Sequence, residues 1–434
     1  MRVFAIDVGT SSVKAAILDV ATALPVGPVS RVAYQLDHPT PDAAEVPAER
    51  LWSAIAAAAH PAAEGIAGIE AIGLSCLTPA LVLLDEADRP LGPIWTHLDR
   101  RARPVAQQVW AEVGATFLAE VGNRPLPGGI SATSYRQQLL QTPSLQRRVK
   151  RYLHVNSWLG LCLTGEAVFD PGNACFSGLF GTMTDQAWSP RWCEYFAVDP
   201  SCLPPVVCGS TTIGTLRPAV AAQLGLPAGV PVKLGTADTS SAILAAEMRQ
   251  GDLLHVVGTT QVLAALTDNP RPSPQRLTRR LGVGKAFIQV THNPVGGVAL
   301  GWLHNLCFRD QTEAEFYGQT ILEARSRSTQ VQLEPAYLGG DRLEIESRQA
   351  AFRELTLSTG RMDLLAALLK ALQCKHREAL AALGMGDHFQ RVFLTGGGAE
   401  VVRQLIPEYA GARVNFLEEG SLRGIAHLFR PVAG

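Results

Sequence analysis

A ten-residue segment near the start of the 434-residue chain recurs near its middle. The first copy is DVGTSSVKAA at residues 7–16, and the second is VVGTTQVLAA at residues 256–265, an offset of 249 residues (256 − 7). In each copy an apolar run leads to a Gly-Thr-Ser/Thr tip and a second apolar run follows, which predicts two strands joined by a tight hairpin. Two short strands can also resemble each other by chance. A repeat more than half the chain away nevertheless predicts two related halves that face each other across a cleft.

Composition restricts the partners that such a chain can have. Lys+Arg total 38 and Asp+Glu total 39, so the formal net charge is −1 and no basic excess is available for nucleic acid or an acidic membrane surface. The length favours two or three domains. Hydrophobic residues make up 47% of the chain, which excludes disorder for most of it. We therefore expect a small-molecule partner.

The cysteines and the apolar runs indicate the cellular compartment in which the protein is expected. The eight cysteines form no C-x-x-C pair and are sparse for a secreted disulfide framework, so we expect ordinary buried thiols and no zinc site. Asp7 comes too early for the apolar core of a signal peptide. The longest uncharged apolar stretch, Ala71 to Leu84, is too short to span a bilayer. The sequence predicts a soluble, cytoplasmic protein.

Strand and helix patterns alternate along the chain. Residues 49–59 are Ala-rich and predict a helix, while 69–75 and 81–84 are apolar runs that predict buried strands. Near the C-terminus, residues 392–394 predict a strand that leads into a Gly-rich turn at 396–399 and a helical pattern. This alternation predicts an α/β fold.

Pro and Gly recur through residues 204–235, so few helices or strands could extend through this stretch. We therefore place a domain boundary at its end. The expected domains are an N-terminal one at 1–236 and a C-terminal one at 237–434.

The two hairpin tips can bind phosphate. Neither G-x-G-x-x-G nor a Walker sequence is present. Small residues at a hairpin tip, however, expose backbone N–H groups, and neighbouring hydroxyls add donors, so two such tips can hold a triphosphate between them. The residues concerned are Gly9, Thr10 and Ser11 in the first tip and Gly258, Thr259 and Thr260 in the second.

Asp7, directly before the first tip, has Val256 as its counterpart in the second copy. Mg²⁺ bound to phosphates needs only one or two carboxylates from the protein. The asymmetry therefore predicts Asp7 as the acid on the magnesium side.

The run Gly396-Gly397-Gly398-Ala399 opens a helix after a strand. Without side chains there, a base or ribose can approach the backbone, and a helix N-terminus favours phosphate. These residues are candidates for nucleotide binding, although a Gly-rich turn of this kind also occurs without a ligand.

A single carboxylate, Asp238, lies among small residues between Gly235 and Ala242. One interpretation is that Asp238 caps the helix that follows. The other is a general base at a cleft-facing helix start, which accepts the proton of a hydroxyl during phosphoryl transfer.

Together these motifs resemble the FGGY family of carbohydrate kinases, within the actin/hexokinase-like ATPase superfamily. The family's landmarks occur in the family's order over almost the whole chain. They are Asp7 to Ser12, Pro93 with His97 to Arg101, Leu163 to Glu166, Asp170, Trp188-Ser189, Gly225 to Asp238, Gly258-Thr259, Gly297 to Trp302 and Gly397 to Ala399. The resemblance implies two actin-like (ribonuclease H-like) domains that close over a sugar, with ATP and Mg²⁺ as cofactors. Relatives are commonly dimers, so a homodimer is expected by analogy.

The resemblance also implies individual roles. Asp238 matches the family's catalytic base, and Asp7 matches its magnesium-associated acid. The positions that match its nucleotide contacts are Thr10, Ser11, Lys14, Thr259, Gly297 and Gly398.

The sugar-binding positions depart from the family pattern. Xylulokinases carry a Met-His pair after the third strand, where this chain has Thr78 and Pro79. The family tryptophan is His97 here, and the residue after the catalytic aspartate is Thr239 rather than Asn or Gln. The ATP half of the site therefore matches the family, and the departures put the substrate in doubt rather than the chemistry.

We expect an ATP-dependent carbohydrate kinase that phosphorylates a hydroxyl of a small sugar, with a ketopentose such as D-xylulose first and D-ribulose next. Thr78 and Asp99 are candidate hydroxyl binders, although Asp99 can instead belong to a solvated ion-pair cluster with Arg100 and Arg101. A kinase for another polyol or an acid, and a nucleotide-binding sensor without turnover, are alternatives on the same fold.

Overall fold

Two large β-sheets organise the computed structural model, which describes residues 1–258, 261–293, 296–334, 345–346, 350–385, 389–396, 409 and 411–430. The first sheet has the order β10-β11-β6-β1-β2-β3, and β4 also pairs with β2. Its strands are β1 (Arg2–Val8), β2 (Ser12–Asp19), β3 (Leu24–Pro25), β4 (Ser30–Ala33), β6 (Ile69–Cys76), β10 (Thr212–Thr215) and β11 (Pro231–Ala237). The second sheet has the order β14-β15-β13-β12-β18-β19. Its strands are β12 (Leu253–Val257), β13 (Gln261–Thr267), β14 (Leu277–Arg280), β15 (Phe287–Asn293), β18 (Arg391–Thr395) and β19 (Arg413–Phe416).

The repeated segment forms an equivalent hairpin in each sheet. β1 pairs antiparallel with β2 on one side and parallel with β6 on the other, and β12 does the same with β13 and β18. Val8 pairs with Val13 at the end of the first hairpin, whereas Val257 pairs with Gln261 in the second, so the second connection is one residue shorter. The predicted α/β fold with a duplicated hairpin is confirmed. Thr259 and Thr260 lie outside the described residues.

Alternate residues of β1 enter two different cores, because side chains along a strand point to opposite faces. Phe4 and Ile6 pack in the core that includes α1, and Val3 and Ala5 pack in the core that includes α15. The helices that cover the first sheet are α1 (Ala48–Ala63) and α5 (Val155–Thr164) on one face and α15 (Gly420–His427), next to α9 (Asp238–Ala245), on the other.

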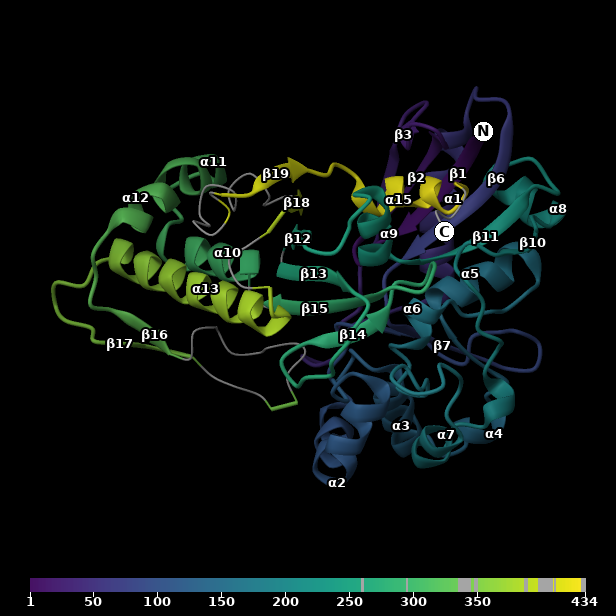
Figure 1. Ribbon diagram of the computed structural model, residues 1–434, viewed down its shortest axis with the longest axis horizontal. Helices are drawn as coiled ribbons and strands as arrows, with labels where there is room; N and C mark the ends of the chain where they lie inside the picture. Colours follow the sequence, from purple (N-terminus) through teal and green to yellow (C-terminus); the bar gives the residue numbers. More distant parts are fainter. Residues whose placement is uncertain are drawn as a thin grey trace.

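The last helix crosses back from the second half of the chain to the first sheet. α15 follows β19 of the second sheet but packs against β1, β2 and β6 (Figure 1). The expected boundary between residues 236 and 237 falls just before the last residue of β11 and remains a proposal. If the chain is divided there, residues 420–427 lie in the C-terminal domain by sequence but pack against the sheet of the N-terminal half.

A second core lies within the first half of the chain, below the first sheet in Figure 1. A four-stranded sheet, in the order β5-β8-β7-β9, contributes to this lobe together with helices α2, α3 and α7. The elements are β5 (Glu45–Val46), β7 (Ala80–Leu84), β8 (Ile94–Thr96), β9 (Arg151–His154), α2 (Arg103–Val121), α3 (Ser131–Gln141) and α7 (Pro190–Phe196). The connecting helices are α4 (Leu145–Arg148), α5 (Val155–Thr164), α6 (Pro171–Ala174), η1 (Pro200–Cys202) and α8 (Pro218–Leu224).

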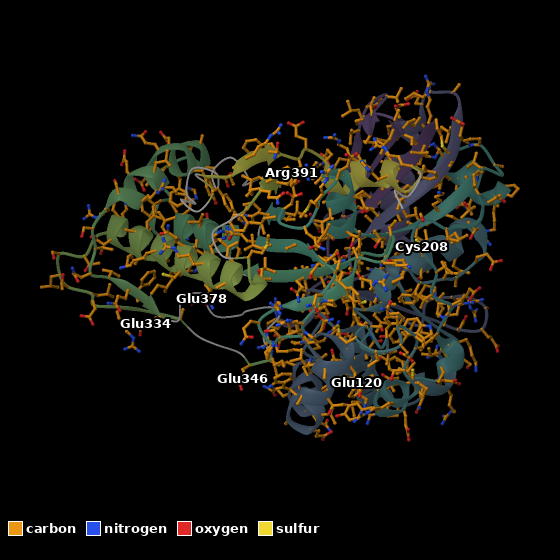
Figure 2. The ribbon with its side chains drawn as sticks, in the orientation of Figure 1. Glu120, Cys208, Glu334, Glu346, Glu378 and Arg391 are labelled. Atoms are coloured by element: carbon orange, nitrogen blue, oxygen red, sulfur yellow. The ribbon has the colours of Figure 1, made fainter. Side chains whose placement is uncertain are left out.

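Helices α10 and α13 flank the second sheet and pack in one core with α12. The elements are α10 (Gly296–Cys307), α11 (Glu313–Glu315), η2 (Phe316–Thr320), α12 (Ile321–Ser326) and α13 (Arg361–Leu383), with a two-stranded sheet of β16 (Gln332–Glu334) and β17 (Ala351–Arg353). Arg391, labelled in Figure 2, pairs with the buried Asp252 at 2.5 Å and so ties the start of β18 to the start of β12.

The elements expected from sequence are present where the structure describes them. The expected helix at 49–59 lies inside α1, and the expected strands at 69–75, 81–84 and 392–394 lie inside β6, β7 and β18. The helical pattern expected after the Gly-rich turn lies outside the described residues.

All eight cysteines are free thiols. The expectation that they are buried is wrong for half of them, because Cys374 is exposed and Cys162, Cys208 and Cys307 are only half-buried. Three of these four lie on helices, where one side faces solvent. Among the described residues, no helix combines the length and apolarity needed to cross a membrane.

Candidate active site

Asp7 ends up buried where three parallel strands finish. It is the penultimate residue of β1 and is 3% exposed. Its Oδ1 accepts a 2.9 Å hydrogen bond from Ser75 on the adjacent β6, and its Oδ2 accepts a 2.6 Å bond from Ser421 on α15. Burial raises the pKa of Asp7 to about 6, the charge of Asp238 adds to the rise, and Ser421, Lys14 and Ser75 oppose it. The site thus holds an acid that is costly to ionise without a cation.

Asp238 lies two strands away from Asp7 at the same sheet edge. β1, β6 and β11 are parallel neighbours, with Asp7 opposite Ser75 and Ala237 opposite Cys76. Two strand spacings correspond to roughly 10 Å. The carboxyl ends of parallel strands are a usual place for ligands in open α/β sheets. The fold therefore brings together the two acids that sequence reasoning singled out.

Asp238 is the first residue of α9, and Ala237 is its N-cap, so the helix-capping interpretation of Asp238 is wrong. The Oδ1 of Asp238 accepts hydrogen bonds from the backbone N–H of Thr239, at 2.6 Å, and from the Thr239 hydroxyl, at 3.2 Å. Its Oδ2 has no hydrogen-bond partner among the residues that the structure describes, and the side chain is half-buried. One oxygen is held in place and the other is available.

The strand that delivers Asp238 depends on a glycine and a buried acid. Gly235 has φ +73°, and a Cβ there would lie 1.6 Å from the carbonyl oxygen of Leu74. Thr236 donates a 2.8 Å hydrogen bond to Asp170, whose pKa is raised because it is buried. Asp170, a landmark in sequence, therefore positions the end of β11.

The first hairpin tip is stabilised by its own backbone and by Tyr34. Gly9 N–H donates to the carbonyl of Ser12 at 2.9 Å, and the Tyr34 hydroxyl donates to the carbonyl of Gly9 at 2.5 Å. Thr10 is half-buried and Ser11 is exposed at the tip. The two hydroxyls follow Asp7 by three and four residues along the hairpin.

Lys14 is engaged with acids in this structure. Its Nζ lies 2.5 Å from Oε2 of Glu419 and 3.9 Å from Oδ2 of Asp7. Glu419, directly before α15, also pairs with Arg31 at 2.7 Å and has φ +48°. The predicted phosphate contact of Lys14 therefore has an internal carboxylate as a competitor.

The expected sugar-side residues separate into two kinds. Thr78, just after β6 and joined to Pro79 by a cis peptide bond, has a buried Oγ1 without a hydrogen-bond partner among the described residues. The hydrogen-bonding capacity of that hydroxyl is therefore unused in the described structure. His97, two residues before Asp99, lies in the turn after β8.

Asp99, by contrast, is held by four hydrogen bonds inside the protein. Its carboxylate accepts from the backbone N–H groups of Ala44 and Arg101 and, at 2.9 and 2.6 Å, from the Arg101 guanidinium. Arg101 also pairs with Glu45 and stacks on Trp95 at 3.6 Å. Asp99 is fully buried, so the cluster is not the solvated ion pair of the alternative interpretation.

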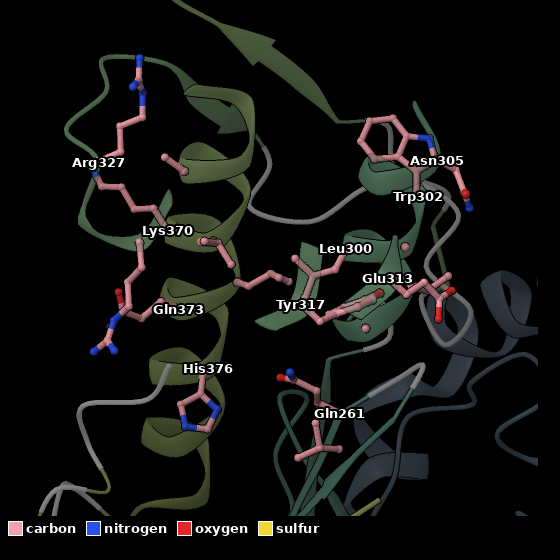
Figure 3. Close-up of a pocket in the computed structure, with 18 of the residues that line it drawn as sticks. Gln261, Leu300, Trp302, Asn305, Glu313, Tyr317, Arg327, Lys370, Gln373 and His376 are labelled. Carbon is pink, nitrogen blue, oxygen red and sulfur yellow. The ribbon is translucent and has the colours of Figure 1, made fainter. Parts of the chain in front are cut away.

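A cavity of about 1340 Å³ opens beside the second hairpin. Its lining includes Gly258 and Gln261 of the hairpin and Gly297 and Trp302 of α10. Figure 3 shows Gln261 and Trp302 on one side of the cavity and His376 of α13 on the other. The Gly297 N–H donates to the Gly258 carbonyl at 3.2 Å, which joins the hairpin to the start of α10. Two expected nucleotide contacts thus lie at one cavity.

The remaining expected nucleotide contacts fall outside the described residues. They are Thr259, Thr260, Gly397, Gly398 and Ala399. In the described part of the chain, no group of three or more His, Cys, Asp or Glu side chains forms a ready-made metal site. Asp7 accordingly stands as a single carboxylate, which suits a cation held mainly by phosphate oxygens.

Sequence reasoning missed Ser75, Ser421 and Glu419. It also missed Arg279, which is buried on β14 and donates a hydrogen bond to Ser240 of α9. Ser75 could have been noticed as a hydroxyl inside an apolar strand. Arg279 could have been noticed as half of an Arg-Arg pair in a short strand. Ser421 and Glu419 carry no signal in the sequence, because only the packing of α15 brings them to Asp7 and Lys14.

Comparison with known proteins identifies the architecture. The model of the FGGY family of carbohydrate kinases, N-terminal domain, matches residues 2–245, more than half of the chain. The chain belongs to the FGGY family of carbohydrate kinases. The structure superimposes on the xylulose kinase from Rhodospirillum rubrum with a TM-score of 0.86 and 25% identity, covering 99% of this chain and 89% of that one. The expected actin-like arrangement of two halves is therefore confirmed.

Curated relatives of this FGGY chain match over part of their length. The putative sugar kinase YoaC from Bacillus subtilis is 26% identical over 267 residues, 61% of this chain and 53% of the relative. The xylulose kinase from Streptomyces rubiginosus is 26% identical over 275 residues, 63% of this chain and 56% of the relative. The chain thus spans about half the length of the curated relatives that it matches.

Proposed function

We propose that this FGGY protein is an ATP-dependent carbohydrate kinase that phosphorylates a hydroxyl of a small sugar, with D-xylulose as the first candidate and D-ribulose as the next. The observation that carries the proposal is the convergence of Asp7 and Asp238 at one edge of β1, β6 and β11. The names of the xylulose kinases among its relatives support the choice of acceptor.

Asp238 is the proposed general base. As the acceptor oxygen bonds to the γ-phosphorus, the bond from that phosphorus to the β–γ bridging oxygen breaks and ADP leaves with the electron pair. The hydroxyl proton passes to Oδ2 of Asp238, the oxygen that has no partner in the described structure. Its other oxygen, held by Thr239, fixes the direction of the carboxylate.

Asp7 is the proposed residue on the Mg²⁺ side. Its two oxygens are oriented by Ser75 and Ser421, and a buried anionic oxygen fits a hard cation of this kind. When bound, Mg²⁺ neutralises charge on the phosphates. Gly9, Thr10, Ser11 and the Gly258–Thr260 tip are the proposed phosphate contacts, and Gly297 with Gly397–Ala399 the proposed nucleoside contacts.

Thr78 is the proposed acceptor contact, because its buried Oγ1 lacks a partner in the described part of the chain. Asp99 enters the proposal only through Arg101, which it holds against Trp95. A cytoplasmic location and a homodimer belong to the proposal as well, and sedimentation of the purified chain tests the second.

The test is ADP release from ATP across ketoses, aldoses and polyols, with Asp238→Asn as the matched variant. We expect one class of acceptor to raise ADP release well above the acceptor-free rate, and this stimulation to fall by roughly 10³-fold or more in Asp238→Asn. If no acceptor raises ADP release while ATP still binds, the protein is instead a nucleotide-binding sensor.

A further inference from the structure

Among the residues that the structure describes, the buried cation Arg279 has no ion-pair partner. It lies on β14, the edge strand of the second sheet, and is 2% exposed. Its Nη1 donates a 2.5 Å hydrogen bond to the hydroxyl of Ser240, and its guanidinium carbon lies 5.2 Å from the centre of the Phe176 ring. Within the described part of the chain, its Nε has no hydrogen-bond partner and no carboxylate lies within 4 Å of the guanidinium.

Such a charge is expensive to bury. Taking an ion out of water costs several kcal/mol unless an opposite charge and hydrogen bonds replace the water. Two other buried charges follow this rule, since Asp252 is paired with Arg391 and Asp99 with Arg101, whereas the neighbouring Arg280 also has no carboxylate partner among the described residues. No described residue supplies an anion to Arg279, so an anion from outside the described chain would stabilise its buried charge.

Arg279 lies beside the proposed general base. Ser240, its hydrogen-bond partner, is two residues after Asp238 on α9. Phe176, its aromatic neighbour, follows α6, which packs against both β14 and β11. Burial lowers the pKa of the guanidinium, and among the charges that oppose this the carboxylate of Asp238 is the strongest.

The reaction brings an anion to this place. When a hydroxyl attacks while Asp238 takes its proton, the γ-phosphorus must lie about 3–3.5 Å from the attacking oxygen. The oxygens of the transferring group are then within a few ångströms of Asp238. Lys14, whose Nζ lies 3.9 Å from Asp7, is already paired with Glu419.

We propose that Arg279 is a further catalytic residue of this kinase, whose guanidinium binds the oxygens of the γ-phosphoryl group as it passes to the acceptor. The proposal rests on the proposed function. An arginine that stabilises the transferring group is worth 10³–10⁵ in kcat in other phosphoryl-transfer enzymes. The same anion-binding chemistry could serve a carboxylate of the acceptor, and the experiment separates the two.

The neighbouring Arg280 is a matched control. It is also buried, at 9% exposed, and its guanidinium stacks on Phe287 and donates to the Gly284 carbonyl at 2.9 Å. Because successive residues of a strand point to opposite faces, Arg280 faces away from the side of β14 on which Arg279 meets Ser240. Arg279→Gln and Arg280→Gln thus remove the same charge from the same strand at similar burial.

The first measurement is turnover. For Arg279→Gln we expect kcat with a neutral sugar to fall by about 10³-fold, with the KM of the sugar nearly unchanged. Arg280→Gln is expected to keep kcat within about threefold of the parent. Arg279→Lys, which keeps the charge and packs more conservatively, is expected to fold and to recover part of the lost kcat.

The second measurement is calorimetric binding of ATP and ADP, which needs no turnover. The parent and Arg280→Gln are expected to bind ATP more tightly than ADP, and Arg279→Gln and Arg279→Lys to lose part or all of that difference. This arm remains decisive if no sugar is turned over, the result that would refute the kinase proposal itself.

Three results overturn the assignment of Arg279. An unchanged ATP-to-ADP affinity ratio together with an unchanged kcat would show that Arg279 touches no phosphate. Equal losses in Arg279→Gln and Arg280→Gln would show a structural role alone. A loss confined to sugar acids, seen as a raised KM for a carboxylate acceptor and normal turnover of neutral sugars, would assign Arg279 to the acceptor instead.

Discussion

Ser421 donates a 2.6 Å hydrogen bond to Oδ2 of Asp7, although 414 residues separate the two along the chain. The contact exists because α15, which follows β19 of the second sheet, packs on the first sheet against β1. Asp7 is thereby enclosed by hydroxyls from two directions, Ser75 on β6 and Ser421 on α15. The orientation of Asp7, the acid proposed to face Mg²⁺, therefore depends on a contact between residues near the two ends of the chain.

Removing the Ser421 hydroxyl should shift the pH dependence of activity. Ser421 lowers the pKa of Asp7, which burial holds at about 6, so Ser421→Ala should raise that pKa further. A hydrogen bond worth about 1 kcal/mol corresponds to roughly 0.7 pH unit. We expect the acidic limb of kcat/KM to move to higher pH by about that amount, whereas Ser421→Thr, which keeps a hydroxyl, stays near the parent. A limb that stays in place in Ser421→Ala would mean that ionisation of Asp7 does not limit activity.

Asp7→Asn should stabilise the protein at neutral pH while abolishing activity. The pKa of Asp7 rises from 3.8 to about 6 on folding because of burial. A raised carboxyl pKa favours the folded state below pH 3.8, and this advantage is lost as pH rises through about 6. The charge then costs about 3 kcal/mol at pH 8.

Urea denaturation in EDTA, at pH 4 and at pH 8, measures this effect. Asp7→Asn should exceed the parent in free energy of unfolding at pH 8 and approach it at pH 4. If the variant is less stable than the parent at both pH values, burial of the charged carboxylate does not lower the free energy of unfolding.

Glu419→Gln should strengthen ATP binding. Glu419 holds Lys14 at 2.5 Å, so ATP must displace a carboxylate before Lys14 can reach a phosphate. A partly buried pair of this kind is worth about 1 kcal/mol. We therefore expect the KM for ATP to fall about fivefold. Glu418→Gln, one residue earlier, is the charge-matched control and should leave it unchanged. A raised KM would instead show that Glu419 positions Lys14 for the nucleotide.

Gly235→Ala should be far more damaging than Gly229→Ala. Both glycines have positive φ, +73° and +79°, so an alanine is strained at either position. Only at Gly235 does the added Cβ also meet backbone, 1.6 Å from the Leu74 carbonyl, while at Gly229 nothing lies within 4 Å. We expect about 1 kcal/mol for Gly229→Ala and more than about 4 kcal/mol for Gly235→Ala in thermal or urea unfolding. Similar losses in the two variants would mean that β6 and β11 can separate freely at this point.

Local pattern was sufficient for the elements. The hairpins at Asp7 and Val256, the Ala-rich helix of α1 and the apolar strand β6 are each specified by neighbours within a few residues, through periodicity and turn chemistry. The acids Asp7 and Asp238 could be singled out because each is a lone carboxylate next to small residues at the end of an apolar run. That a domain-scale duplication exists could also be read from the sequence alone, since both copies of the hairpin kept the same pattern.

Side-chain availability could not be predicted, because it depends on what packs against a residue from distant parts of the chain. Asp99 matched a family landmark, yet Arg101 and Ala44 take up its oxygens. Lys14 matched a phosphate contact, yet Glu419 holds it. Arg279 drew no attention, yet it is buried beside Asp238 without an ion-pair partner among the described residues.

The sequence by itself determined the α/β class, the repeated hairpin and the two acids, because these follow from short-range patterns of apolar, small and charged residues. Tertiary structure alone decided which hydroxyls orient Asp7, which oxygen of Asp238 is available and that Arg279 is buried beside it with no ion-pair partner among the described residues. Those properties arise from desolvation and from contacts such as Ser421 with Asp7, whose partners are hundreds of residues apart.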